Sequence, residues 1–216
     1  SPLRCEVTQA VLIDILRLRD HEEIDPFRFK ELMKEMIEDG FQRDPIIVDK
    51  ESGVVLDGHH RRNILKTLGY SKIASYQVQY MEDDKIRVKT WYPVVIGSKR
   101  RLMQIIEDHG IELTPNNKNN SKNLLVLKGR TFQLPSRNEV MNALLEKIKF
   151  QYVSTKNLAL RLVEEGRVAG AFIFKPVTKE DVLMVALSND PFPPKTTRHI
   201  IPSRPKNWFI PLKKLK

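Results

Sequence analysis

The sequence contains a single cysteine, Cys5, and no long run of apolar residues. One thiol can form neither an internal disulfide nor a zinc cluster, and such low cysteine usage is typical of a reducing cytoplasm. No stretch approaches the roughly 20 apolar residues of a membrane-spanning helix, and the N-terminal residues do not follow the signal-peptide pattern. We therefore expect a cytoplasmic protein without a membrane partner.

Two glycine-rich phosphate-binding motifs are also absent. The chain contains neither the GxxxxGK[ST] sequence of a P-loop nor the glycine-rich loop of a protein kinase. The formal net charge is nevertheless +10 and the pI is near 9.7, which calls for an anionic partner. Nucleic acid, a membrane surface and a phosphorylated small molecule all qualify, and charge alone does not choose among them. Part of the excess lies in the segment 211–216, where solubility is a sufficient reason for it.

The hydrophobic periodicity predicts alternating strands and helices with a polar break near the middle of the chain. Asp25-Pro26 is typical of a helix start, and the polar run 114–121 is typical of a loop or linker. These features predict an α/β to α+β fold with an N-terminal domain over 1–112 and a smaller α+β domain over 113–216. The predicted strands are 11–18, 45–48, 54–56, 73–80, 86–92, 124–127, 131–134, 150–153 and 171–174. The predicted helices end at Gly40 and Gly69 or cover 98–109, 137–147, 156–165 and 178–187.

The clearest chemical signal is the DGHHR turn, in which an apolar strand ends at Asp57 and a helix begins after Gly58. A helix start offers unpaired N–H groups and a partial positive charge, both of which suit a phosphate. Gly58 lets the backbone approach a ligand closely, and Arg61 can bind phosphate through two parallel hydrogen bonds. Because basic residues are unfavourable at a helix start unless an anion lies there, we prefer a phosphate site to a simple capped turn. His59 and His60 would supply further donors.

Glu22, in the sequence His21-Glu22-Glu23, admits two interpretations. Two adjacent carboxylates between a strand and a helix are usually solvated, and one of them can favour the helix start. Alternatively, Glu22 is a general base that takes a proton from a hydroxyl group. The residues by themselves favour the first interpretation.

Two later stretches are also ambiguous. The proline-rich run 191–202 is either a functional loop or a rigid surface connection. Its hydroxyl and cationic donors are Thr196, Thr197, Arg198 and His199. Trp91 lies beside Tyr92 at a strand end, where an aromatic residue belongs to the core more often than to a ligand site.

The DGHHR turn, with an apolar strand before it and a leucine-containing helix after it, resembles that of the ParB/sulfiredoxin superfamily. Within this superfamily, the chain is most similar to the archaeal free L-serine kinases. The resemblance rests on four stretches that follow in order along almost the whole chain: His21-Glu22, 57–61, 90–93 and 194–199. The PKTTRH sequence of the last stretch is the most specific, whereas the DGHHR turn alone marks the superfamily.

This resemblance implies transfer of the terminal phosphate of ATP or ADP to the hydroxyl of free L-serine, giving O-phospho-L-serine for cysteine biosynthesis. It implies that Glu22 is the catalytic base and that Asp57 assists catalysis, either by holding Mg²⁺ or by orienting a neighbouring group. The implied phosphate-binding residues are Gly58, His59, His60 and Arg61. The residues implied to face serine or phosphate are Trp91, Thr196, Thr197, Arg198 and His199. The active site would lie in the cleft between the two domains, with the 194–199 loop reaching into it.

Two other members of the superfamily provide alternatives. Sulfiredoxins carry a catalytic cysteine in this turn, where this chain has His59, so we exclude sulfiredoxin chemistry. ParB-type proteins bind DNA and use CTP, and they carry a helix-turn-helix domain after this module. The nearest candidate here, 154–174, has a helix followed by a strand-like segment, which is a poor recognition helix. A ParB-like DNA- and nucleotide-binding regulator without kinase turnover is therefore the second hypothesis. The choice between ATP and ADP, the adenine pocket, the oligomeric state and the acceptor range stay open.

Overall fold

The computed structural model describes residues 10–116 and 123–216, so that Cys5 and positions 117–121 of the expected linker lie outside it. The described residues form two compact units. Unit 1 comprises the described part of Ser1–Arg87 together with Thr178–Pro194 and His199–Lys216, and unit 2 comprises the described part of Val88–Val177 together with Lys195–Arg198. The chain passes from unit 1 to unit 2 after Arg87, whereas the sequence predicted a boundary between 112 and 113. Two later segments, Thr178–Pro194 and His199–Lys216, return to unit 1.

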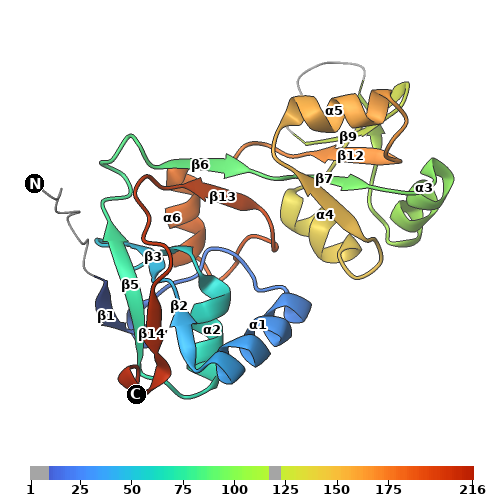
Figure 1. The fold of residues 1–216 in the computed structure, drawn as a ribbon. Coiled ribbons are helices and arrows are strands. Elements are labelled where there is room, and N and C mark those ends of the chain that lie inside the picture. Colours follow the sequence, from blue (N-terminus) through green and yellow to red (C-terminus); the bar gives the residue numbers. More distant parts are fainter. Residues whose placement is uncertain (1–9, 117–122) are drawn as a thin grey trace, which may run out of the picture. The chain divides into compact units, whose positions relative to one another are not determined.

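Unit 1 is built on a mixed four-stranded sheet with the order β1-β5-β3-β4 (Figure 1). Its strands are β1 (Val11–Asp14), β3 (Ile46–Asp49), β4 (Val55–Asp57) and β5 (Lys72–Val78). The central pair β3–β5 is parallel, and the other two pairs are antiparallel. The prediction of one strand over 11–18 is wrong beyond Asp14. The Asp14 carboxylate accepts a hydrogen bond from the Leu16 N–H and caps the short 3₁₀ helix η1 (Ile15–Arg17).

The helices of unit 1 are α1 (Pro26–Asp39), α2 (His59–Thr67) and α6 (Lys179–Leu187). The predicted start and stop of α1 are confirmed: the Asp25 carboxylate accepts hydrogen bonds from two first-turn N–H groups, and Gly40 ends the helix with φ 71°. In α1, Met36 is buried whereas the neighbouring Ile37 is 55% exposed. α1 packs against α2, and both face the sheet core.

The C-terminal segment belongs to this core. β14 (Phe209–Pro211) pairs antiparallel with β2 (Phe41–Arg43), and the 3₁₀ helix η2 (Leu212–Lys214) follows. Leu215 is fully buried, and its carbonyl accepts a hydrogen bond from the Lys72 N–H at 3.0 Å. The segment 211–216 is therefore not a loose tail, since its leucines complete the hydrophobic core. Its lysines are exposed, and a solubility role for their charge stays a prediction.

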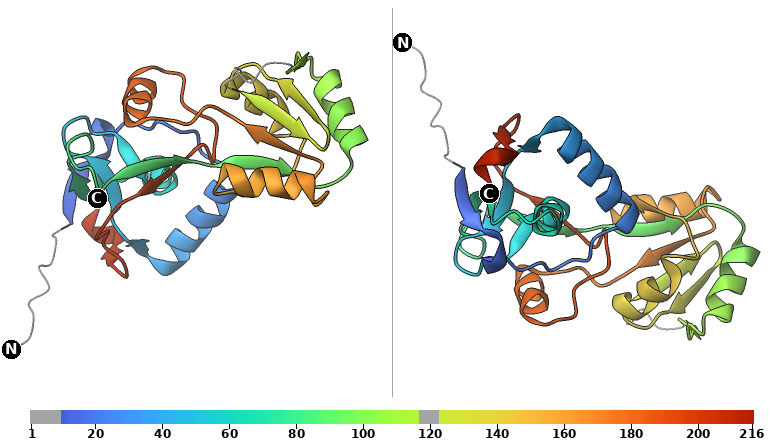
Figure 2. Two further views of the ribbon diagram at one scale, coloured as in Figure 1. Left: turned by 90° about the horizontal axis from the view of Figure 1, so that it is seen from above. Right: turned by 90° about the horizontal axis from the view of Figure 1, so that it is seen from below.

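Unit 2 is a six-stranded sheet with the order β11-β7-β12-β9-β10-β8, antiparallel between every described pair. Its strands are β7 (Tyr92–Val95), β8 (Thr114–Pro115), β9 (Leu124–Leu127), β10 (Arg130–Gln133), β11 (Phe150–Val153) and β12 (Gly170–Ile173). Its helices are α3 (Lys99–Asp108), α4 (Arg137–Leu144) and α5 (Lys156–Glu164). Adjacent residues such as Val94 and Val95 face opposite sides of the sheet, so α5 covers one face while α3 and α4 cover the other (Figure 2).

A separate two-stranded sheet joins β6 (Arg87–Thr90) and β13 (Thr197–Ile200). The predicted strand over 86–92 is interrupted at Trp91, whose N–H donates to the Thr196 carbonyl at 3.0 Å. Residues 154–174 form α5 and then β12, which confirms the expected helix followed by a strand. Among the described residues, no helix has both the length and the apolar character needed to cross a lipid bilayer.

Candidate active site

The turn between β4 and α2 requires a glycine. Gly58 has φ 105°, and a Cβ atom added there would lie 2.4 Å from Cγ2 of Ile46 and 3.0 Å from Nη2 of Arg61. The backbone can therefore approach β3 and Arg61 only without a side chain. This close approach places the start of α2 beside the end of β4, where Asp57 lies.

A buried carboxylate–imidazole pair occupies the start of α2. Nε2 of His59 lies 2.9 Å from Oε2 of Glu22, and the two residues are 9% and 7% exposed. Burial alone would lower the pKa of His59, but the hydrogen bond and charge of Glu22 outweigh it and raise that pKa. The raised pKa favours the imidazolium form of His59, in which Nε2 donates to Glu22. The negative charge that the basic helix start requires is supplied here by the protein's own carboxylate.

The backbone on both sides of Glu22 is fixed by a segment far away in the sequence. The Phe192 N–H donates to the His21 carbonyl and the Glu23 N–H donates to the Phe192 carbonyl, both at 2.8 Å. This parallel bridge holds Glu22 between two hydrogen bonds. Sequence reasoning missed Phe192, because no local pattern indicates a pairing across such a separation.

Two further histidines are buried beside this pair. Burial, together with the charge of His59, lowers the pKa of His21 to about 4, and its Nδ1 lies 2.9 Å from the Val55 carbonyl. Burial, followed by the charge of His21, lowers the pKa of His199 to about 3. Nε2 of His199 lies 2.8 Å from the Tyr80 hydroxyl. Burial raises the pKa of Tyr80, so the phenol stays protonated and its O–H donates the hydrogen bond to His199. His21 and His199 are therefore neutral, and their ring centroids are 5.5 Å apart.

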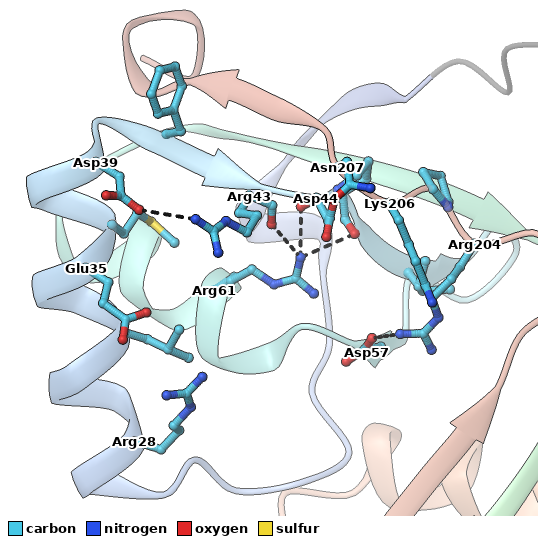
Figure 3. Close-up of a pocket in the computed structure, with 16 residues that line it drawn as sticks. Arg28, Glu35, Asp39, Arg43, Asp44, Asp57, Arg61, Arg204, Lys206 and Asn207 are labelled. Atoms are coloured by element: carbon cyan, nitrogen blue, oxygen red, sulfur yellow. Dashed lines mark hydrogen bonds and ion pairs between the residues drawn. The ribbon is translucent and has the colours of Figure 1, made fainter.

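A pocket of about 400 Å³ adjoins the other side of the turn (Figure 3). Its charged residues are Arg28, Glu35, Asp39, Arg43, Asp44, Asp57, Arg61, Arg204 and Lys206. Nη1 of Arg61 donates to the carbonyls of Arg43 at 2.9 Å and Asp44 at 2.8 Å, which ties α2 to the loop between β2 and β3. The structure thus places Arg61 in the pocket wall with part of its guanidinium already engaged.

Asp57 is paired with Arg204, a residue that sequence reasoning missed. Nη1 of Arg204 donates to Oδ2 of Asp57, and Nη2 lies 3.4 Å from the His199 carbonyl. Burial alone would raise the pKa of Asp57, but the charges of Arg61 and Arg204 outweigh it and lower that pKa. Asp57 is therefore a carboxylate. The only sequence signal at Arg204 is its place in a basic, proline-flanked run, which is too common to identify a site residue.

His60 lies between the starts of two helices. Its Nε2 accepts a hydrogen bond from the Asp25 N–H at 3.0 Å, and burial, followed by the charge of His59, lowers its pKa. The structure therefore brings Gly58, His59 and Arg61 close to Asp57. Nε2 of His60 instead contacts Asp25, the N-cap of α1. Its predicted contact with phosphate stays a prediction.

Trp91 and the Lys195–Arg198 part of the PKTTRH segment come together within unit 2. The Lys195 ammonium and the Arg198 guanidinium lie 5.4 and 5.2 Å from the centroid of the Trp91 ring. Thr196 is 3% exposed, Thr197 begins β13, and Trp91 itself is half-buried. Trp91 is thus a platform for two cations rather than a fully buried core residue.

The residues present are compatible with Mg²⁺ only if the nucleotide shares in binding it. Among residues 10–116 and 123–216, no group of three or more metal-ligating side chains occurs. Mg²⁺ is usually bound by one or two carboxylates together with substrate phosphates and water. Asp57, ionised beside the pocket, fits that requirement.

No protein-family model matches the sequence. A solved structure of a free serine kinase in complex with AMP has a TM-score of 0.86 and 25% identity, with coverage of 96% of this chain and 93% of the other. The fold and the site accordingly define a nucleotide-dependent phosphotransferase.

Sequence relatives specify the family. The ATP-dependent L-serine kinase of Staphylothermus marinus is 34% identical, over 96% of this chain and 92% of the relative. The ADP-dependent L-serine kinase SerK of Thermococcus kodakarensis is 25% identical, over 95% and 92%. A ParB-like protein of Sulfolobus acidocaldarius is also 25% identical, over 92% of each chain. The chain belongs to the L-serine kinase family, which confirms the resemblance seen in the sequence.

Proposed function

We propose that this protein transfers the terminal phosphate of ATP or ADP to the hydroxyl of free L-serine and forms O-phospho-L-serine. The observation that carries the proposal is the buried Glu22–His59 pair, which lies at the same helix start as Asp57 and the arginine-lined pocket. A carboxylate near a pocket that is lined with arginines is what transfer of a phosphoryl group to a hydroxyl requires.

The pocket beside Asp57 would hold the nucleotide. Its apolar residues Leu32, Met36 and Ile47 suit a base, and its arginine and lysine side chains suit the phosphates. The start of α2, with Gly58 and His59, would face the transferred phosphate. Asp57 would hold Mg²⁺, which when bound neutralises charge on the phosphates.

Glu22 would accept the proton of the serine hydroxyl. As the hydroxyl oxygen forms its bond to the terminal phosphorus, the bond from that phosphorus to the bridging oxygen breaks, and the shortened nucleotide leaves. His59 holds Oε2 of Glu22 and places a positive charge beside the reacting groups. Positioning and charge neutralisation would therefore supply most of the catalysis.

The serine-facing residues remain a proposal. Trp91, Thr196, Thr197 and Arg198 would contact serine or its new phosphate, whereas His199, buried with Tyr80 and His21, would act by positioning its neighbours. The expected location of the site in a cleft between two domains stays a prediction, as do the cytoplasmic location and the use of the product in cysteine biosynthesis. ATP is the favoured donor, because a relative named ATP-dependent is more similar to this chain than the one named ADP-dependent.

A direct product assay tests the proposal. The purified chain is incubated with Mg²⁺, L-serine and either ATP or ADP in separate reactions, and phosphoserine is measured by mass spectrometry. We expect phosphoserine, with ATP as the better donor, and none when L-serine is omitted. No phosphoserine from either donor, together with salt-sensitive binding to duplex DNA, would instead support the ParB-like regulator.

A further inference from the structure

We propose that Arg204 is a further catalytic residue, which exchanges its ion pair with Asp57 for the nucleotide phosphates when the nucleotide binds. The inference rests on the proposed function for the identity of the anion. It goes beyond that function by assigning a phosphate contact to Arg204, a residue that neither the sequence motifs nor the resemblance named.

The two arginines beside Asp57 differ in how firmly they are held. Nη1 of Arg61 is shared among three backbone carbonyls, those of Arg43, Asp44 and Pro45. Arg204 donates to one carboxylate oxygen and makes a long 3.4 Å contact with the His199 carbonyl. Arg61 is therefore anchored in the wall, and Arg204 is the arginine that can change partners.

The Asp57–Arg204 pair can be broken at little cost. The two side chains are 39% and 29% exposed, and ion pairs this accessible to water contribute little to stability. A nucleoside diphosphate or triphosphate carries more negative charge than one carboxylate. Its phosphate also offers the guanidinium two oxygens at once. A phosphate within reach would therefore compete successfully with Asp57 for Arg204.

The backbone keeps Arg204 at the pocket during such an exchange. Arg204 lies between β13 and β14, and beyond it the Trp208 N–H donates to Oδ1 of Asp44 while the Asp44 N–H donates to the Trp208 carbonyl, at 2.9 and 2.7 Å. Asp44 also supplies one of the carbonyls that hold Arg61. Both arginines are thus positioned by one residue, and only the side chain of Arg204 has to move.

The exchange would also free a carboxylate oxygen of Asp57, which now accepts from Arg204. The exchange would therefore expose a carboxylate, ready to bind a cation, at the moment when the phosphates arrive. The pair with Arg204 would otherwise occupy Oδ2 of Asp57.

Calorimetry with ADP and with adenosine, which lacks phosphate, tests the exchange on the full chain. We expect Arg204→Gln to weaken ADP binding about 10- to 100-fold, the effect of losing a charge-assisted hydrogen bond, and to leave adenosine binding unchanged. Arg204→Lys keeps the charge without the planar fork, so an intermediate loss confined to ADP is expected. Arg167→Gln, which removes an exposed arginine of unit 2, is the matched control for net charge and should leave both ligands unchanged.

The outcomes separate this inference from the proposed function. If wild-type protein makes phosphoserine and binds ADP, but Arg204→Gln binds ADP equally well, Arg204 has no phosphate contact and the inference alone fails. Equal losses for ADP and adenosine would show that Arg204 only shapes the pocket. If the wild-type protein binds neither ATP nor ADP, the proposed function fails with the inference. A crystal structure of the ADP complex should show the Arg204 guanidinium on phosphate oxygens, and retention of the Asp57 pair there would overturn the exchange.

Discussion

Glu22 explains why a buried histidine is tolerated at position 59, in the first turn of α2. The sequence argument required an anion there, and the structure provides a carboxylate from a loop 37 residues earlier in the chain. The hydrogen bond and charge of Glu22 offset the burial of the His59 imidazole. The same pair would serve catalysis, because it fixes the carboxylate in one orientation before a substrate hydroxyl arrives.

Glu22→Gln should remove most of the turnover and leave nucleotide binding intact. The amide keeps the shape and the contact with His59 but does not accept the hydroxyl proton, so we expect kcat to fall about 100-fold or more. Phosphoserine production and ADP calorimetry measure the two effects. Glu23→Gln, an exposed neighbouring carboxylate, is the control and should retain wild-type kcat. Full activity in Glu22→Gln would rule out the assignment of the base.

At the scale of elements, the β4–α2 turn is the feature on which the site depends. Gly58→Ala introduces a Cβ at φ 105° and against Cγ2 of Ile46, so we expect a loss of about 2–4 kcal/mol in unfolding free energy. Urea denaturation measures it. Gly69→Ala has a similar backbone conformation, φ 79°, but no atom within 4 Å of the new Cβ, so it should cost only about 1 kcal/mol. Equal losses in the two variants would show that the close approach at Gly58 is unimportant.

Local signals in the sequence predicted most helices and strands. The Asp25 cap, the Gly40 stop and the apolar run before Asp57 depend on neighbouring residues only, and the structure confirms each of them. Strand β9 and strand β11 have the predicted bounds for the same reason. The DGHHR turn was also recognisable, since its glycine and its basic helix start are adjacent in the chain.

Long-range pairing was beyond the reach of these signals. Strand β13 has four residues in a proline-rich run and exists because β6 lies beside it, so no periodicity of its own indicates it. The partners of the site residues are equally remote: Phe192 beside Glu22, Tyr80 beside His199, and Arg204 beside Asp57. The sequence could indicate candidate site residues, but it could not show which residues form ion pairs or hydrogen bonds with them.

At the scale of the whole molecule, unit 1 depends on residues from the far end of the chain. Leu215→Ala should destabilise the protein by about 2–5 kcal/mol, because Leu215 is fully buried in the sheet core. Urea denaturation is again the measurement. Leu187→Ala, at a leucine that is 65% exposed, should change stability by less than about 0.5 kcal/mol. A solubility tail would give a negligible effect at both positions.

Stability should fall in mild acid. The pKa values of His21 and His199, about 4 and about 3, lie below the ordinary 6.5, so below pH 6.5 the unfolded chain binds protons that the folded protein does not. His59, whose pKa is raised, acts in the opposite direction and offsets a small part of this loss, whereas the lowered pKa of His60 adds to it. We expect the unfolding free energy to be about 2–5 kcal/mol lower at pH 4.5 than at pH 7.

Urea denaturation across that pH range checks this expectation. His199→Gln removes one of the two buried groups that resist protonation, so its stability should depend less steeply on pH between 6.5 and 4.5. An unchanged slope in that variant would show that His199 does not contribute to the acid sensitivity.

The discontinuity of unit 1 also governs the order in which the protein can be made. A ribosome releases β1 to β5 early, then the whole of Val88–Val177, and only later the residues around Leu215. Until those residues leave the exit tunnel, β2 lacks its partner β14 and the core lacks two leucines. Unit 2 has most of its residues much sooner. The nascent chain therefore carries an incomplete unit 1 while the residues of unit 2 are being synthesised. Asp57 cannot pair with Arg204 until the segment after β13 has been synthesised.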